Sequence, residues 1–263
     1  MAVLVGLGLY LAFQHVTPLL RGSDCTATGG GQKITLGTGQ AGIAATIAGV
    51  AQREALPARA VTVAYAAALQ ESKLQNLTYG DRDSVGVFQQ RPSQGWGKRR
   101  ALENPVYATS RFFRALTKVP GYQRMPVYQA AQAVQHSADG LAYQRFQLLA
   151  AQITPAFTGQ EPHAVWCWYT PAISGKARVN AASLELARTF GTRSARATPD
   201  PGLIVQVRSA RQGWAVATWL VSHAQQFRIG EVRYAGYEWT AADGARGWAR
   251  TVSPALPGSV QLG

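Results

Sequence analysis

Glu71 is the residue whose type and position best suit acid–base chemistry. It lies near the end of a helix predicted over residues 59–73, in a stretch of small and apolar residues. One and two turns earlier, the same helical face carries Ala64, Ala67 and Ala68. Small side chains there would let another chain segment or a sugar ring approach the carboxyl. An apolar setting favours a protonated carboxyl, which a general acid for a glycosidic oxygen requires. The alternative is that Glu71 pairs with a basic residue and supports packing.

Two further acids, Asp81 and Asp83, follow Glu71 by ten and twelve residues. Either could supply a second carboxylate, as in a glycoside hydrolase, where the separation of the two acids sets the stereochemistry. We predict this role for Asp83. The alternative is a turn held by aspartate side chains and a local ion pair with Arg82, because aspartate favours turns.

Aromatic residues accompany these acids at Tyr79, Phe88 and Trp96. Aromatic rings stack on the faces of sugars, but they are equally ordinary members of a core. Both interpretations stay open for each ring, and Trp96 is our candidate for substrate binding.

The elements that must position these residues are mainly helical. Apolar residues at helical spacing, ended by proline or glycine, predict helices over residues 40–55, 59–73, 105–117, 126–137 and 141–153. Glycines and a proline crowd the segment between the second and third of these helices, which predicts a long structured loop over residues 74–100.

Two short motifs in this region resemble a known family. Gln70-Glu71-Ser72, followed by Gly86-Val87-Phe88-Gln89, is similar to the first two motifs of the lytic transglycosylases with a soluble-lysozyme-like domain. Residues 133–137, AVQHS, occupy the place of the third motif and match it poorly. The resemblance covers about residues 39–157. The string GDRDSVGVFQQRPSQGWG, residues 80–97, also looks like that of anchored Gram-positive wall proteins with this domain.

The resemblance implies a role for each matching residue. Glu71 would protonate the glycosidic oxygen between N-acetylmuramic acid and N-acetylglucosamine, and would then accept the proton of the muramic C6 hydroxyl as an anhydro ring closes. The resemblance implies substrate contacts from Ser72, Gln89 and Gln90, a close backbone approach at Gly86, and support of the carboxyl by Tyr143. Neither a cofactor nor a metal is expected.

The chain has two cysteines, Cys25 and Cys167. Counting alone leaves open a single long-range disulfide or two buried thiols. In the anchored wall proteins of the resemblance, one cysteine just outside the membrane and one after the domain recur, which implies a Cys25–Cys167 bridge.

The net charge of +13 would attract polyanions such as nucleic acid, anionic lipid or acidic wall polymers. Basic residues are scattered, whereas a nucleic-acid module more often carries a basic stripe with interleaved aromatics. The scatter therefore predicts no nucleic-acid partner, and the resemblance implies peptidoglycan glycan strands as the partner.

The first residues are strongly apolar. Residues 2–20 carry no charged side chain and are about long enough to span a bilayer. They predict a membrane anchor or signal over residues 1–22. The predicted localisation is the cell membrane, with one N-terminal span and extracytoplasmic domains, or alternatively secretion.

The predicted fold class is α+β, a mainly helical lysozyme-like domain followed by a small α+β domain. The boundaries are a Gly/Thr-rich linker at 23–39, the lysozyme-like domain at 40–157, a second linker at 158–178 and the C-terminal domain at 179–263. In the last, strands are expected over residues 203–207, 231–234 and 237–240 and a helix over 214–227. Its tryptophans suit a core or a wall-binding surface.

Two functions follow from the sequence. The first is a muralytic enzyme that cleaves the glycan strand of peptidoglycan. The second is a lysozyme fold with weak or no turnover that binds the wall as a scaffold. The intact Glu71 and Gly86–Gln89 motifs favour the first, and the poor third motif favours the second.

Overall fold

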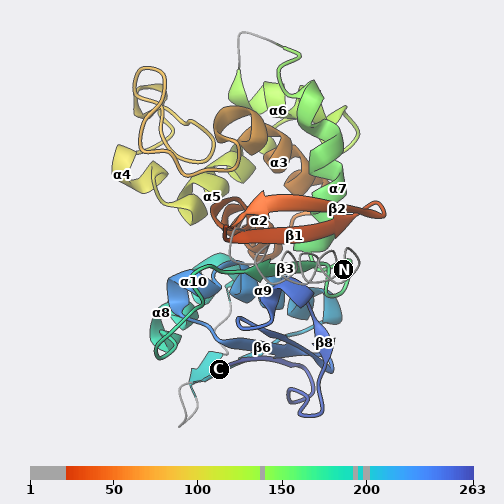
Figure 1. Ribbon diagram of the computed structural model, residues 1–263. Helices are drawn as coiled ribbons and strands as arrows, with labels where there is room; N and C mark the ends of the chain where they lie inside the picture. Colours follow the sequence, from red (N-terminus) through yellow and green to blue (C-terminus); the bar gives the residue numbers. More distant parts are fainter. Residues whose placement is uncertain (1–21, 137–139, 192–194, 198–201) are drawn as a thin grey trace, which may run out of the picture.

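The computed structural model describes residues 22–136, 140–191, 195–197 and 202–263. The protein has a mixed α+β fold, as predicted. Figure 1 shows a helical lobe stacked on a C-terminal lobe, with the hairpin β1–β2 running between them. The helical lobe contains α2–α7, and the C-terminal lobe contains the larger sheet with α8–α10.

The helical lobe is built around α3, which extends over Ala58–Ser72. Every residue from Ala60 to Leu69 is buried, because its alanines and valines allow neighbouring helices to approach on all sides. The helices around it, several of them in direct contact, are α2 (Thr38–Arg53), α4 (Arg99–Leu102), α5 (Pro105–Leu116), α6 (Val127–Gln135) and α7 (Gln147–Phe157).

The helix predicted over residues 141–153 differs from the sequence-based expectation at both ends. A 3-10 turn, Gln144–Phe146, precedes α7, and α7 continues through Pro155 to Phe157. The predicted helix therefore began too early and ended too early. It was ended at residue 153 because Pro155 was taken as a helix breaker. The helical hydrogen bonding continues past Pro155, because the backbone N–H of Thr158 donates to Thr154 O at the end of α7.

The segment predicted as a linker over residues 23–39 is instead a hairpin, and that prediction was wrong. Strand β1 extends over Asp24–Gly29 and β2 over Gln32–Gly37, in antiparallel register. Gly30 and Gly31 form the turn with φ of 58° and 77°. A two-residue turn with positive φ at both positions favours Gly-Gly, and threonine and isoleucine favour the flanking strands.

The predicted linker over residues 158–178 also contains a strand, β3, at Val165–Trp168. It pairs antiparallel with β1 and places Cys167 opposite Cys25, completing a three-stranded sheet of order β2-β1-β3. The two cysteines are buried and form a disulfide, so the predicted bridge is confirmed. The linker prediction failed here because the partner strand lies 142 residues earlier in the chain.

The C-terminal lobe packs its helices on a six-stranded antiparallel sheet of order β4-β5-β9-β6-β7-β8. The predicted strand pair is confirmed as β6 and β7, joined by Ala235 and Gly236 at positive φ. The bounds are α8 Val179–Phe190, α9 Ala210–Ser222, α10 Ala224–Phe227, β4 Ala195–Ala197, β5 Leu203–Gln206, β6 Glu231–Tyr234, β7 Tyr237–Thr240, β8 Ala249–Arg250 and β9 Ser259–Leu262, with a 3-10 turn at Gly244–Arg246.

Strand β3 joins the two lobes. The indole N–H of Trp239 donates to Cys167 O at 3.0 Å, and that of Trp248 donates to Val165 O at 2.7 Å. Tyr169, just after β3, donates its hydroxyl to Val221 O of α9. Trp239 is fully buried, which confirms the packing interpretation of this tryptophan. Together with the packing of α2 on α9, these contacts make one continuous core.

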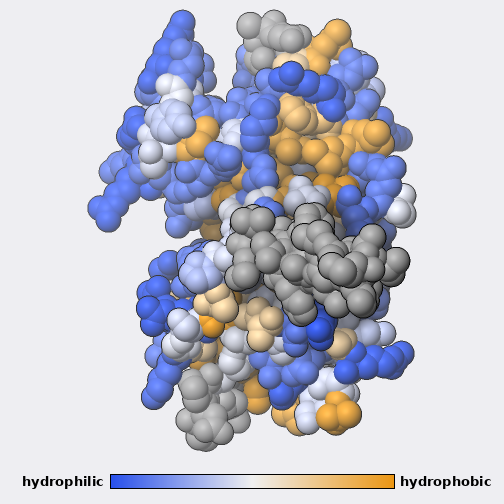
Figure 2. All heavy atoms as spheres, in the orientation of Figure 1, coloured by the Kyte–Doolittle hydropathy of each residue, from blue (hydrophilic) through white to orange (hydrophobic). Residues whose placement is uncertain are grey.

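The expectation of a membrane-anchored protein is corrected. None of the helices in the described part of the chain is long and apolar enough to cross a bilayer, so the predicted N-terminal span and membrane localisation are not supported. Residues 2–20, on which that prediction rested, lie outside the described residues. Figure 2 shows that apolar surface gathers around α7, whereas the surface of the loop before α4 is mainly hydrophilic. Leu148 of α7, with 68% exposure, belongs to the exposed apolar residues.

Candidate functional site

Glu71 lies in the last turn of α3, where that helix leaves the core. The alanines at positions 64, 67 and 68 are fully buried, so the small face that precedes Glu71 contacts other chain segments. Lys73 and Leu74 then end the helix with φ of 58° at both positions. Left-handed backbone at two successive residues other than glycine is unfavourable, so the surrounding contacts must hold this helix end in place.

Tyr143 contacts the Glu71 carboxyl directly. Its hydroxyl donates to Glu71 Oε1 at 2.7 Å, and the tyrosine is fully buried while Glu71 is half-buried. Among the described residues, no other hydrogen bond and no ion pair reaches this carboxyl. One carboxyl oxygen is therefore fixed by a neutral donor, which leaves Oε2 available.

Two cations lie near this helix end without pairing with Glu71. Lys73 Nζ lies 4.5 Å from the centre of the Phe146 ring, and the Arg145 guanidinium lies 4.9 Å from the same ring. Arg145 also donates to Gln70 Oε1 at 2.8 Å. Burial and the charge of Arg145 lower the pKa of Lys73, and the negative charge of Glu71 partly offsets both effects. The sequence analysis missed this cluster, because nothing in the spacing links residues 145–146 to residue 73.

The second motif forms a tight turn between Val85 and Gln90, whose backbones pair in an isolated antiparallel bridge. Gly86 has φ of 78° and donates its N–H to Leu77 O at 2.6 Å. A Cβ at this position would lie 2.4 Å from Leu102 O. Glycine is therefore required here by a contact within the protein as well as by its backbone conformation.

Ser72 connects the two motifs. Its hydroxyl donates to Val87 O at 2.7 Å, its oxygen accepts from Gln75 N, and the side chain is buried. The Ser72 hydroxyl therefore makes a bond that holds the turn against the end of α3. The acid and the turn are positioned together as a consequence.

The two predicted glutamines also have partners within the protein. Gln90 is buried and donates to Ala108 O of α5 at 3.2 Å. Gln89, with φ of 46°, donates to Gly86 O at 3.2 Å and to Tyr79 O at 3.3 Å. Gln90 thus anchors the turn to α5. Gln89 is half-buried and braces the loop from inside.

The segment in the place of the third motif contacts the second. Gln135, at the end of α6, donates to Phe88 O at 2.8 Å. The Phe88 ring stacks on Phe112 of α5 with ring centres 4.5 Å apart, and both rings are fully buried. Three segments distant in sequence therefore meet around Gly86–Gln89. The poor motif match over residues 133–137 gave only a weak signal of this contact.

Asp83 forms the structural turn that the sequence analysis weighed as its alternative. Arg91 Nε donates to Asp83 Oδ1 at 2.8 Å, and Ser93 N donates to Oδ2 at 2.7 Å. The Arg91 hydrogen bond, followed by that of Ser93, holds the pKa of this carboxyl well below its usual range. Asp81 is largely exposed, and its Oδ2 lies 3.9 Å from Arg82 Nε. Asp83 is thus engaged in shaping the loop.

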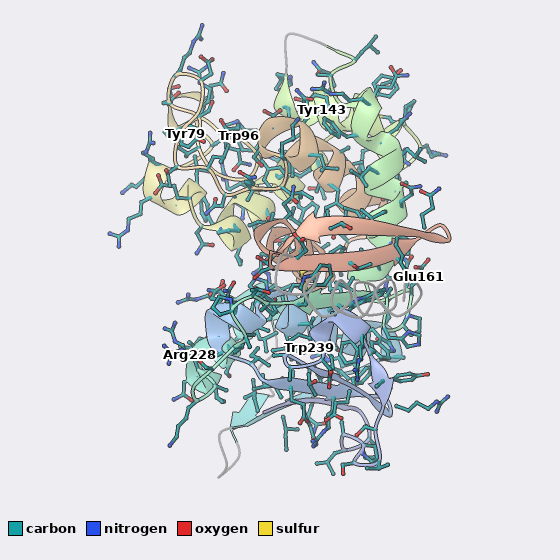
Figure 3. The ribbon with its side chains drawn as sticks, viewed as in Figure 1. Tyr79, Trp96, Tyr143, Glu161, Arg228 and Trp239 are labelled. Carbon is teal, nitrogen blue, oxygen red and sulfur yellow. A yellow bond between two sulfur atoms is a disulfide. The ribbon has the colours of Figure 1, made fainter. Side chains whose placement is uncertain are left out.

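A cleft of about 540 Å³ opens beside the second motif. Gln135 lines it, together with Trp96, Val119 and three cations of or just after α5, which are Arg111, Arg114 and Lys118. Figure 3 shows Trp96 on the inner side of the glycine-rich loop, between Tyr79 and the helices near Tyr143. Tyr79 is 70% exposed, so the three aromatic residues of this region have different environments: Tyr79 on the surface, Phe88 in the core and Trp96 at the cleft.

Within the described residues, no three histidine, cysteine, aspartate or glutamate side chains gather closely enough to hold a metal ion. The sequence matches no protein-family model, and it has no significant match among curated proteins. The chemistry of the site therefore has to be argued from its geometry.

Proposed function

We propose that the helical lobe is a lysozyme-like domain that cleaves the β-1,4 bond between N-acetylmuramic acid and N-acetylglucosamine in peptidoglycan glycan strands. Glu71 is its general acid and base. The observation that carries this proposal is the Tyr143–Glu71 hydrogen bond at the end of a buried helix, beside the Gly86–Gln89 turn. The disulfide supports it, because disulfides persist in oxidising compartments, where a wall polymer is also found.

The geometry assigns a role to each oxygen of the carboxyl. Tyr143 donates to Oε1, so the proton for transfer is carried on Oε2. That proton passes to the glycosidic oxygen as its bond to the muramic C1 breaks. The muramic C6 hydroxyl then attacks C1, and its proton returns to Oε2. The Tyr143 hydrogen bond stabilises the carboxylate that exists between the two steps, since hydrogen bonds to charged groups are the stronger ones.

This route needs one carboxylate, because the nucleophile belongs to the substrate. The state of Asp83 supports it over a two-carboxylate hydrolysis. A carboxylate that already accepts from Arg91 and Ser93 is poorly suited to activate water. We therefore assign Asp83 to positioning of the loop and propose an anhydro-sugar product.

A second candidate is a lysozyme-like binding module with weak or no turnover. The observation that favours it is that Ser72, Gln89 and Gln90, all expected to contact substrate, donate to carbonyl oxygens within the protein. A glycan would then be held by fewer side chains than the sequence suggested. Both candidates bind the same polymer, and they differ in turnover.

The test is digestion of purified peptidoglycan by the full chain, with separation of soluble products by liquid chromatography and mass spectrometry. We expect anhydromuropeptides from the wild type and none above background from Glu71→Gln. Reducing-end muropeptides in place of anhydro products would show hydrolysis and would return a second carboxylate to consideration.

Glu238→Gln is the matched control, because it removes a half-buried carboxylate of the C-terminal lobe. It should retain wild-type turnover. No product above background from either the wild type or Glu71→Gln, with binding to the wall preserved in both, would leave the binding module as the function.

A further inference from the structure

The cleft beside the Gly86–Gln89 turn carries a concentration of positive charge that the proposed chemistry does not use. Arg111, Arg114 and Lys118 follow one another at spacings of three and four residues, which places them on one side of α5 and its extension. The opposite side of α5 carries Phe112 and Phe113, both fully buried. The amphipathic character of this helix therefore directs its cations into the cleft.

These charges have no acidic counterpart among the described lining residues. Arg111 donates to Gly95 O at 3.0 Å, which ties α5 to the segment that carries Trp96. Arg114 and Lys118 are exposed, and neither forms an ion pair with any carboxylate of the described residues. The cleft is thus a hollow with an uncompensated positive charge, which attracts anionic groups.

The cleft is joined to the proposed acid by a short chain of contacts. Glu71 precedes Ser72, whose hydroxyl donates to Val87 O. Phe88 follows, and its carbonyl accepts from Gln135, which lines the cleft. The helix end that carries Glu71 and the cleft-lining Gln135 are therefore both bonded to the Gly86–Gln89 turn.

We propose that this cleft is a subsite for the acidic peptides that substitute the muramic acid residues of the glycan strand. The inference rests on the proposed function. About 10 Å separates Arg111 from Lys118 along the helix, from a rise of 1.5 Å per residue. Cations spaced in this way suit several carboxylates along an extended chain better than one compact anion.

The remaining walls of the cleft agree with a peptide. Trp96, Ala115, Val119, Ala133 and Val134 supply apolar surface between and opposite the cations. Peptides with alanine and other aliphatic side chains would bury methyl groups against this surface, while their carboxylates face the cations. A polyol phosphate polymer would offer negative charge to the cations but no aliphatic side chains to the apolar wall of the cleft. The volume of about 540 Å³ is that of a site for a few residues.

The experiment measures binding with the Glu71→Gln full chain, so that turnover does not consume the ligand. The probes are soluble glycan strands that retain their peptides, and the same strands after an amidase has removed them. We expect about tenfold tighter binding of the peptide-bearing strands at low salt. Adding Arg114→Gln and Lys118→Gln should abolish that preference and leave the affinity for stripped strands unchanged.

Lys176→Gln with Arg208→Gln is the matched control. Both residues are exposed on the C-terminal lobe, and the pair removes the same charge of two. This control should keep the full preference. Equal preference in the cleft variant and the control would overturn the inference, as would a parallel loss of affinity for stripped strands. The inference would also be overturned if the cleft variant lost binding to a polyglycerol phosphate but kept its preference for peptide-bearing strands.

Failure of the proposed function gives a different result. A wild-type chain that releases no product but prefers peptide-bearing strands would retain the cleft as a binding site without catalysis. A chain that cleaves both kinds of strand at equal rates and binds them equally would retain the catalysis and remove the cleft inference.

Discussion

Two carboxyl environments, one in each lobe, contrast with each other. In the C-terminal lobe, Arg233 lies between Glu231 and Glu238 and forms ion pairs with both. In the helical lobe, the carboxyl of Glu71 accepts one hydrogen bond from the neutral hydroxyl of Tyr143. An arginine satisfies and neutralises a carboxylate, whereas a tyrosine orients it and leaves its charge unpaired. A half-buried acid held by a neutral donor therefore suits the proton transfer that we propose for Glu71.

The aromatic residues differ between the lobes in the same way. Trp239 and Trp248 of the C-terminal lobe donate their indole N–H groups to backbone carbonyls of β3. Trp96 of the helical lobe is half-buried and lines a cleft. The comparison indicates that Trp239 and Trp248 stabilise the junction, whereas Trp96 lies at an open surface of the helical lobe. The predictions below test this division.

The largest effect is expected from exchanging carboxylates for amides in the two lobes. Glu71→Gln should lower the rate of glycan cleavage by at least about 10³-fold, since general acid–base catalysis contributes factors of this order. Glu238→Gln should leave the rate within about twofold and lower the free energy of unfolding by about 1 kcal/mol or less, because the Arg233 pair is partly exposed. Initial rates of product release and thermal unfolding measure the two effects.

A Glu238→Gln variant as inactive as Glu71→Gln would break the division between the lobes. Circular dichroism of both variants is the control, because a folding defect would lower the rate in either case.

Removal of the disulfide should act on stability without acting on chemistry. The bridge closes a loop with a sequence separation of 142 residues. In the chain-entropy model, a loop of this length corresponds to about 5 kcal/mol. Cys25→Ser with Cys167→Ser should therefore lower the Tm by about 10–20 °C. The initial cleavage rate at 20 °C should stay near that of the wild type, because neither cysteine contacts the Glu71 site.

Calorimetry of the double variant and of the oxidised wild type gives the comparison. A Tm within 3 °C of the wild type would mean that the strand pairing of β1 and β3 holds the junction without the covalent bond.

Local sequence signals predicted much of the fold. The helix that carries Glu71 was expected over residues 59–73 and forms as Ala58–Ser72, because its buried positions are mostly alanine and valine at helical spacing. The pair β6–β7 was expected within its observed bounds, since Tyr-Ala-Gly-Tyr supplies a turn between alternating strands. Tyr143 was named from a resemblance and lies against Glu71.

The features that were missed depend on contacts between distant segments. Strand β3 has a short apolar sequence that becomes a strand only beside β1. The cleft requires α5, the end of α6 and the glycine-rich loop together, so its cations appear in the sequence as scattered charges. The hairpin β1–β2 is different, because its Gly30-Gly31 turn was readable and was taken for a linker.

Two tyrosines allow the roles of the lobes to be compared by removing one hydroxyl from each. Tyr143→Phe removes the donor to Glu71 Oε1, and Tyr169→Phe removes the donor to Val221 O. A hydrogen bond to a charged group contributes about 1.5–3 kcal/mol. We therefore expect Tyr143→Phe to lower kcat by about 10–100-fold with little change in KM. Tyr169→Phe should leave kcat unchanged and lower the free energy of unfolding by about 1 kcal/mol.

Steady-state rates on soluble glycan strands separate kcat from KM in both variants. A rise in KM at constant kcat for Tyr143→Phe would show that this tyrosine binds the substrate and does not position the acid.

The smallest effect is expected from the titration of His223, at the junction of α2 and α9. Its Nδ1 donates to Trp219 O at 2.8 Å, and its ring stacks on the Trp219 ring with centres 4.1 Å apart. Burial lowers the pKa of His223 to about 4, and the hydrogen bond to Trp219 offsets only part of this change. The folded state therefore holds the neutral ring at pH values where the unfolded chain, with an ordinary pKa of about 6.5, binds a proton.

The sign of the pH dependence follows from this difference. The contribution of the neutral His223 ring to the free energy of unfolding is complete above pH 6.5. It is lost as the pH falls toward 4, because protons then bind preferentially to the unfolded chain. After allowance for the partial exposure of the ring, we expect a loss of about 2 kcal/mol across this range. His223→Gln should flatten the pH dependence of the free energy of unfolding between pH 6.5 and 4.

Asp83, whose pKa is held below its usual range, adds its own loss of stability only below about pH 4. Asp83→Asn should therefore change the pH dependence only in that lower range. Urea unfolding at half-unit pH steps distinguishes the two, and an unchanged slope in His223→Gln would assign the acid sensitivity to groups outside the junction.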